Sequence, residues 1–288
     1  MRKILSLLLF IISALFAQAQ YNALLWKITG NGLKKPSYLY GTMHTSDARI
    51  LRQGDKALPY LEQTKQYAME LDPKESFNIA MLEKVMMGKG YSLKKMIPER
   101  EYKLVDSLVE KSTGVSLALF DNISPVFISA IVEADGSGLQ KNTTRESFLD
   151  TYLSEKAAKK KKTVVGIETV DEQIGALNVL SYQEQADLLV DAVHDLEKGA
   201  DTGGDMVKYY LEQNLDSIAE MDATADMPPK LYRSLVTDRN KRMAERIGDM
   251  AQKQSTFAAV GALHLPGNEG VITLLREKGY TVEAVKMD

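Results

Sequence analysis

Short apolar runs of strand character alternate with long helical stretches along this chain, and this alternation limits the fold more than any other feature. Strands that alternate with helices predict an α/β architecture. The mostly helical stretch from residue 77 to about residue 201 is typical of an insertion between two strand-bearing parts. The runs lie at residues 23–29, 37–40, 66–71, 163–168, 257–260 and 281–285. Helical patterns run through residues 55–63, 102–111, 126–133, 147–160, 174–196, 206–221, 231–252 and 268–279.

Two of these runs end in the same frame, Gly-x-x-His. The first frame ends in His44 after Gly41, and the second ends in His264 after Gly261. Glycine at this position permits a sharp turn out of a strand, including a positive φ. The chain has only three histidines, so two of them delivered from two strand ends indicate one shared site. The alternative for each is a histidine that caps a turn.

Acidic residues also stand where two other runs end. Glu70 lies near the exit of residues 66–71, and Glu168 closes residues 163–168. Sites in open α/β sheets form at the carboxyl ends of strands. We therefore expect Glu70 and Glu168 near His44 and His264, although a strand-terminal glutamate is also commonly solvated. Two imidazoles with one or two carboxylates would suit a divalent ion, either zinc, manganese, cobalt or iron(II).

Two other side chains, Arg239 and His194, could contribute to this site. Arg239 precedes the second histidine run and could pair with Glu168, stabilise a developing oxyanion or form an ordinary surface ion pair. His194 lies on an ordinary helix face, which favours a structural role. The chain has no Gly-x-Ser-x-Gly elbow, no His-Glu-x-x-His and no Walker or dinucleotide fingerprint.

The amino-terminal residues are typical of a cleaved secretory signal. Arg2 and Lys3 precede an apolar stretch at residues 4–16, and residues 17–19 form an A-x-A cleavage site. We expect cleavage after Ala19, which leaves residues 20–288 as a single exported domain, either periplasmic or secreted. The alternative is a retained N-terminal anchor. No other long apolar segment predicts a membrane span.

Composition restricts the chemistry further. The chain has no cysteine, which excludes disulfides, a lipidated N-terminal cysteine and thiolate metal ligands. Metal ligands must then be His, Asp, Glu or backbone oxygen. The net charge of -3 gives no reason to expect nucleic acid as a partner.

Taken together, these residues resemble the TraB/GumN family, which includes the Tiki metalloproteases. The resemblance spans essentially the whole mature chain. In this resemblance His44 and His264 match the two histidines of the family motifs. Glu168 matches the acidic position of the middle motif, and Arg239 matches the arginine position. Glu70 is a weaker match to an acidic position. The matching segments are residues 26–28, 37–44, 165–169, 172–173, 239–240, 260–267 and 279–282.

The resemblance implies a central mixed β-sheet flanked by helices, with two pseudo-symmetric halves. It also implies a metal-dependent hydrolase of peptidase type, because Tiki proteins are described as proteases that use paired Gly-x-x-His motifs and acidic residues. The family is also likened to esterase-type hydrolases and to a haem- or iron-binding lipoprotein group. The animal proteins have disulfides that this chain lacks, so their extracellular substrate surface need not be shared.

The resulting hypothesis is an exported hydrolase of unknown peptide or ester substrates. His44, His264 and Glu168 would hold the metal, which would lower the pKa of a bound water and polarise a substrate carbonyl. Glu70 would act as general base, and Arg239 would stabilise the developing negative charge. The alternatives are a non-catalytic periplasmic or surface protein that binds metal or haem, and a scaffold for protein contacts. The sequence leaves the oligomeric state open.

Overall fold

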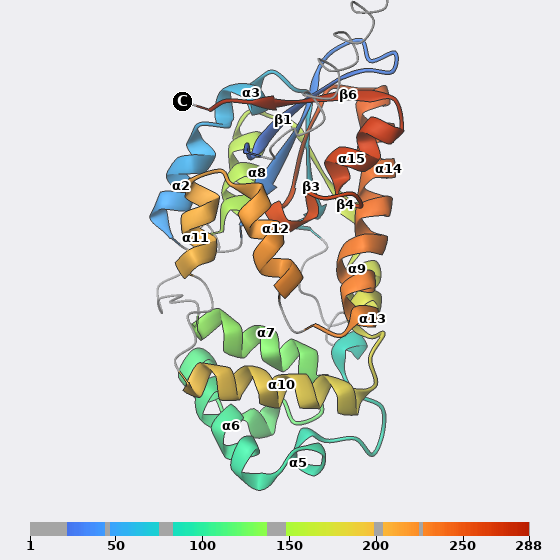
Figure 1. The fold of residues 1–288 in the computed structure, drawn as a ribbon. Coiled ribbons are helices and arrows are strands. Elements are labelled where there is room, and N and C mark those ends of the chain that lie inside the picture. The colour runs from blue at the N-terminus through green and yellow to red at the C-terminus, as the bar shows by residue number, and fades with distance from the viewer. Residues whose placement is uncertain are drawn as a thin grey trace, which may run out of the picture.

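The protein has an α/β fold in which a six-stranded mixed sheet is flanked by helices (Figure 1). The computed structural model describes residues 22–43, 47–74, 83–136, 148–198, 204–224 and 227–287. His44 and the expected signal segment therefore lie outside the described residues. The strands are β1 (Leu25–Gly30), β2 (Ser37–Thr42), β3 (Gln66–Leu71), β4 (Thr163–Glu168), β5 (Thr256–Gly261) and β6 (Tyr280–Val285).

The sheet has the order β4-β3-β5-β2-β1-β6. Its first four members run parallel, whereas β1 is antiparallel to both β2 and β6. Strands β1 and β2, which follow each other in the chain, form an antiparallel hairpin. Parallel strands deliver their carboxyl ends to one edge of the sheet, so the ends of β4, β3, β5 and β2 meet there.

Burial follows the place of each strand in the sheet. Residues 257–260 of β5 are all fully buried, because this strand has neighbours on both sides and helices on both faces. The edge strand β6 instead alternates buried and exposed positions over its first four residues. Continuous apolar runs in the sequence thus correspond to the central parallel strands.

Helices cover both faces of the sheet. Figure 1 shows α14 and α15 on one side of it and α2, α8 and α11 on the other. Their bounds are α2 (Ala48–Asp55), α3 (Leu58–Glu62), α8 (Leu149–Lys159), α9 (Val170–Leu177), α11 (Gly204–Leu211), α12 (Leu215–Thr224), α13 (Pro229–Tyr232), α14 (Asp238–Lys253) and α15 (Val271–Glu277). A π-helix, η3 (Arg233–Thr237), joins α13 to α14, and a 3₁₀ turn, η4 (Ala262–His264), follows β5.

A second group of helices packs around its own apolar cluster. Its members are α5 (Leu93–Met96), α6 (Glu99–Thr113), η1 (Leu117–Leu119), α7 (Pro125–Gly136) and α10 (Tyr182–Glu197). Buried residues of this cluster include Val105, Ile128 and Leu189, and they are distinct from the cluster around the sheet. In Figure 1 this group lies below the sheet. Most of it falls between β3 and β4, where the sequence predicts a helical stretch.

Several helix boundaries differ from the prediction. The predicted helix at 174–196 is two helices, because Ser181 and Glu184 form a capping box that begins α10. The predicted helix at 206–221 is also divided, with Gln213 at a φ of 56° between α11 and α12. Helix α2 was not predicted, and the helix predicted at 55–63 is only α3. No helix among the described residues is long and apolar enough to cross a membrane.

Candidate functional site

Four of the five predicted site residues meet at the carboxyl edge of the parallel strands. Glu70 is the penultimate residue of β3, and Glu168 is the last residue of β4. His264 ends the 3₁₀ turn that follows β5, and Arg239 lies in the first turn of α14. The fifth residue, His44, lies outside the described residues.

The two Gly-x-x-His frames start side by side. Strands β2 and β5 are parallel neighbours, with Gly41 opposite Val260 and Thr42 opposite Gly261. Tyr210 of α11 donates a 2.8 Å hydrogen bond from its hydroxyl to the carbonyl of Gly41. Burial raises the pKa of Tyr210 well above its ordinary value, which keeps the phenol protonated as a donor. The first frame is therefore fixed in position up to the point where the described residues stop.

The glycines of these frames do not adopt the positive φ that the sequence allowed. Neither is among the glycines of positive φ, and Gly261 has a φ of -51°. Gly41 is instead needed for close packing, because a Cβ there would lie 3.2 Å from both the Cα of Ala262 and a methyl carbon of Leu265. Glycine at position 41 allows the first Gly-x-x-His frame to pack closely against the residues of the second.

Arg239 binds both glutamates. Its Nη2 lies 2.6 Å from Oε2 of Glu70 and 2.7 Å from Oε2 of Glu168, and its Nε donates to that same Glu168 oxygen at 2.9 Å. Burial by itself would lower the pKa of Arg239, but the hydrogen bond to Glu168 and the charge of Glu70 raise it overall. The pairing with Glu168 that the sequence suggested is present. The alternative of a surface ion pair is wrong, since Arg239 is 9% exposed.

Glu168 is surrounded by cationic donors. Its side chain has no exposed surface, and its second oxygen, Oε1, accepts a 3.3 Å hydrogen bond from Nη2 of Arg242. Both carboxylate oxygens are therefore engaged by arginines. These arginines offset the cost of burying the Glu168 carboxylate, because a buried charge needs a paired and hydrogen-bonded partner.

Glu70 is held differently. Its Oε1 accepts a 2.7 Å hydrogen bond from the backbone N–H of Gly261, and the same oxygen lies 4.0 Å from Nε2 of His264. Gln173 of α9 donates to Oε2 of both glutamates, at 3.3 Å for Glu70 and 3.4 Å for Glu168. One Glu70 oxygen thus faces Arg239, and the other faces the second histidine.

Asn240 holds the other side of His264. Its Oδ1 lies 2.7 Å from Nδ1 of His264, and its Nδ2 donates a 2.9 Å hydrogen bond to the carbonyl of Glu269. Asn240 is 2% exposed, so this contact is shielded from water. In the sequence, Asn240 belongs only to the matching segment 239–240, and no role was predicted for it.

A stripe of three arginines on α14 faces the end of β4. Arg239, Arg242 and Arg246 are spaced three and four residues apart, which places them on one face of the helix. Arg246 donates to the carbonyl of Ile167 at 2.8 Å and binds both oxygens of Glu172. Its hydrogen bond lowers the pKa of Glu172 to about 2. This spacing was a signal in the sequence that could have identified Arg242 and Arg246.

The turn that leads into α14 is a π-helix. Arg239 lies two residues after it and donates a 3.4 Å hydrogen bond from Nη1 to the carbonyl of Leu235 within it. Single π-turns occur frequently at functional sites. The π-turn belongs to the local structure that supports the arginine.

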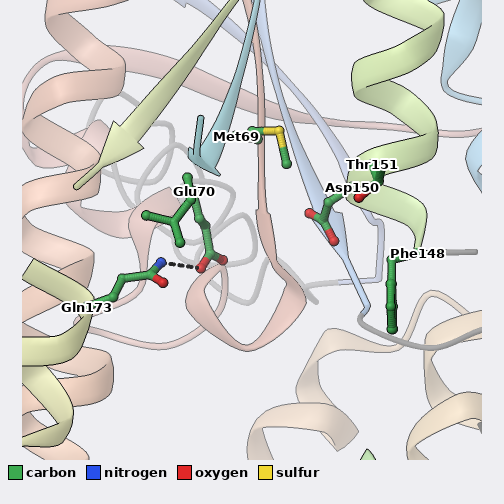
Figure 2. A pocket seen from close by; sticks show the side chains of 7 residues that line it. Met69, Glu70, Phe148, Asp150, Thr151 and Gln173 are labelled. Carbon is green, nitrogen blue, oxygen red and sulfur yellow. Dashed lines mark hydrogen bonds between the residues drawn. The ribbon is translucent and has the colours of Figure 1, made fainter. Parts of the chain in front are cut away.

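A cavity of about 280 Å³ lies beside Glu70. Figure 2 shows the carboxylates of Glu70 and Asp150 on different sides of it, with Phe148 nearby. Asp150 is buried at the start of α8 and accepts a 2.7 Å hydrogen bond from the hydroxyl of Thr42. The sequence gave no signal for Asp150, because it contacts β2 across more than a hundred residues of chain. The lining residues are Met69, Glu70, Leu71, Phe148, Asp150, Thr151 and Gln173.

The metal-donor set is incomplete within the part of the chain that the structure describes. No group of three or more His, Asp or Glu side chains there is arranged to hold a metal ion. The donors that face each other are Nε2 of His264 and Oε1 of Glu70, a nitrogen and an oxygen of the kind that divalent transition metals bind. A third side-chain ligand would have to come from outside this set, and His44 is the predicted one.

Comparison with known proteins finds matches over most of this chain. A model of the TraB/PrgY/gumN family matches residues 24–284. Metalloprotease TIKI2 of Danio rerio is 25% identical over 93% of this chain and 62% of its own length. Metalloprotease TIKI1 of Danio rerio is 26% identical over 92% of this chain and 64% of its own length. Metalloprotease TIKI1 of Homo sapiens is 26% identical over 92% of this chain and 62% of its own length. The matched region thus spans less than two thirds of the length of these relatives. No solved structure matches it significantly.

Proposed function

Because this chain belongs to the TraB/PrgY/gumN family, we propose that it is a metal-dependent hydrolase of peptide or ester bonds. Its distant homology to TIKI metalloproteases supports this class of reaction. The single observation that carries the proposal is the pair formed by His264 and Glu70. Nε2 of His264 and Oε1 of Glu70 face each other at 4.0 Å from neighbouring strand ends. A hydrogen bond holds each side chain in place, from the backbone N–H of Gly261 to Glu70 and between Asn240 and His264.

The hydrogen bonds favour a particular division of roles. His264, Glu70 and His44 would hold the ion, whereas Glu168 would act through Arg239 as a positioning residue. In contrast to the sequence hypothesis, the carboxylate ligand is then Glu70 and not Glu168, because both oxygens of Glu168 already bind arginines. A bound manganese, cobalt, zinc or iron(II) ion would supply Lewis-acid activation of water and of a substrate carbonyl.

Arg239 is better suited to hold Glu70 than to bind a substrate oxyanion. Its Nη2 and Nε are directed at the two glutamates, and its Nη1 is directed at Leu235. The arginine holds Oε2 of Glu70, which leaves Oε1 oriented towards His264. The cavity beside Glu70 gives a substrate access to this carboxylate.

Metal content and hydrolysis together test the function. The purified protein should bind close to one equivalent of Zn²⁺, Mn²⁺ or Co²⁺ in calorimetry. The loaded protein should cleave members of a peptide and ester panel, and a chelator should stop the reaction. Metal binding without any turnover would favour the alternative of a non-catalytic metal- or haem-binding protein. If none of these ions binds, both the proposed hydrolase and the metal-binding alternative fail.

Export is the second part of the proposal. Residues 1–19 carry a basic start, an apolar stretch and an A-x-A site, which together are typical of a cleaved secretory signal. The protein recovered from the periplasm or the medium of an exporting host should begin at Gln20. Intact-mass measurement would show this, and a mass that retains Met1 to Ala19 would refute cleavage.

A further inference from the structure

The contact between Asn240 and His264 determines more than the position of the ring. The amide of Asn240 has two ends, one that only donates and one that only accepts. The carbonyl of Glu269 can only accept a hydrogen bond, so the atom 2.9 Å from it must be the donating Nδ2. The accepting Oδ1 is therefore the atom that faces Nδ1 of His264 at 2.7 Å.

This orientation fixes where the imidazole carries its proton. A neutral imidazole has one N–H and one nitrogen with a lone pair. Since Oδ1 of Asn240 can only accept, Nδ1 of His264 must be the N–H. The lone pair is then on Nε2, the nitrogen that faces Oε1 of Glu70 at 4.0 Å. Both residues are buried, with Asn240 at 2% and His264 at 7% exposure, so water does not compete readily for Nδ1.

We propose that Asn240 is a positioning residue that holds His264 in the Nδ1–H tautomer and directs the Nε2 lone pair towards Glu70. The consequence for metal binding rests on the proposed function, because only an unprotonated nitrogen can bind a metal ion. Ligating histidines commonly donate their other N–H to an oxygen acceptor, and loss of that acceptor typically weakens metal binding. Asn240 supplies such an acceptor on the element that also carries Arg239.

Nitrogen-15 NMR of the metal-free protein tests the tautomer directly. The chain has three histidines, so the ring-nitrogen spectrum is simple, and the His264→Ala variant assigns the signal. At about pH 8.5, well above the ordinary pKa of histidine, His264 should show a protonated Nδ1 and an unprotonated Nε2. In Asn240→Leu, and in Asn240→Ala should the leucine variant fail to fold, the ring should become a mixture of both tautomers.

A matched control distinguishes a direct effect on the His264 tautomer from a general loosening of the segment around Glu269. Thr237→Val removes the 3.2 Å hydrogen bond to the Glu269 side chain but leaves the Asn240 amide in place. This variant should keep the Nδ1–H tautomer. A protonated Nε2 in the parent protein, or an unchanged tautomer in both Asn240 variants, would overturn the proposal.

Zn²⁺ titration of the same variants distinguishes this proposal from the proposed function. Asn240→Leu should weaken Zn²⁺ binding about 10- to 100-fold, and Thr237→Val should not change it. If the tautomer shifts as expected but Zn²⁺ affinity stays at the parent level, the role of Asn240 stands. In that case the assignment of His264 as a metal ligand fails.

Discussion

Replacement of Arg239 by methionine should lower the free energy of unfolding by about 3–5 kcal/mol at neutral pH. The substitution keeps the aliphatic bulk but removes the cation that binds Glu70 and Glu168 together. Arg242 remains 3.3 Å from Glu168, so the loss acts mainly on Glu70. Two carboxylates are then left close together in a buried site. Urea unfolding of the parent and the variant measures the difference.

The same variant should respond to pH in a characteristic direction. Protonation would relieve the repulsion between the two carboxylates, so the folded variant gains protons relative to its unfolded chain. Its stability relative to the parent should therefore fall as pH rises and recover as pH falls from about 8 to about 5. Arg233→Met is the matched control, because this arginine is in the adjacent π-helix with a side chain 75% exposed. It should change stability by no more than about 0.5 kcal/mol.

A loss below about 1 kcal/mol in Arg239→Met, the range measured for exposed ion pairs, would contradict this account. A larger loss that is constant with pH would also contradict it, because the destabilisation would then arise from packing and not from charge.

Replacement of His264 by alanine should abolish detectable metal binding and reduce hydrolysis at least about 100-fold, since a ligand is removed from the ion. His44→Ala should have the same effect. His264→Ala should remain folded, with a loss of about 1–3 kcal/mol because Asn240 loses its buried partner. Calorimetry, turnover of the substrates found for the parent and circular dichroism provide the three readouts.

The third histidine is the control for that experiment. His194 belongs to α10 in the second group of helices, with its Nε2 3.5 Å from Glu101 and its side chain 33% exposed. His194→Ala should retain metal binding and hydrolysis. Parent-level metal binding in His264→Ala would remove the basis for the proposed site.

The sequence predicted the strands better than the helix boundaries, for physical reasons. The parallel strands are buried on both faces and therefore appear as continuous apolar runs. Helix α2 was not predicted because half of its residues are polar or charged and only Ile50 is a buried apolar side chain. The division between α9 and α10 depends on the Ser181 cap, a short signal that the apolar periodicity on either side obscures.

The sequence could predict those site residues that stand at or just after the end of a strand. Glu70, Glu168 and His264 were found because parallel strands deliver their ends to one edge. Asn240 and Gln173 could not be given roles, because their contacts depend on how α14 and α9 dock on the sheet. Asp150 likewise depends on tertiary packing. His44, the cleavage site, the extent of the single domain and the pseudo-symmetry of the halves stay predictions.

The central place of β5 has a consequence for the order in which the molecule can be assembled. Without it, the sheet is divided into the β1–β2 hairpin, on which β6 pairs, and the β3–β4 pair, and these two parts are not neighbours in the sheet. Strand β5 joins these two halves, yet it is synthesised after all four of their strands, together with the His264 turn. Pairings between such distant segments form slowly, since the chain must close long loops first. A nascent or truncated chain that ends before residue 256 therefore has neither a continuous sheet nor a complete site, and any activity of this fold begins only once β5 and the His264 turn have been made.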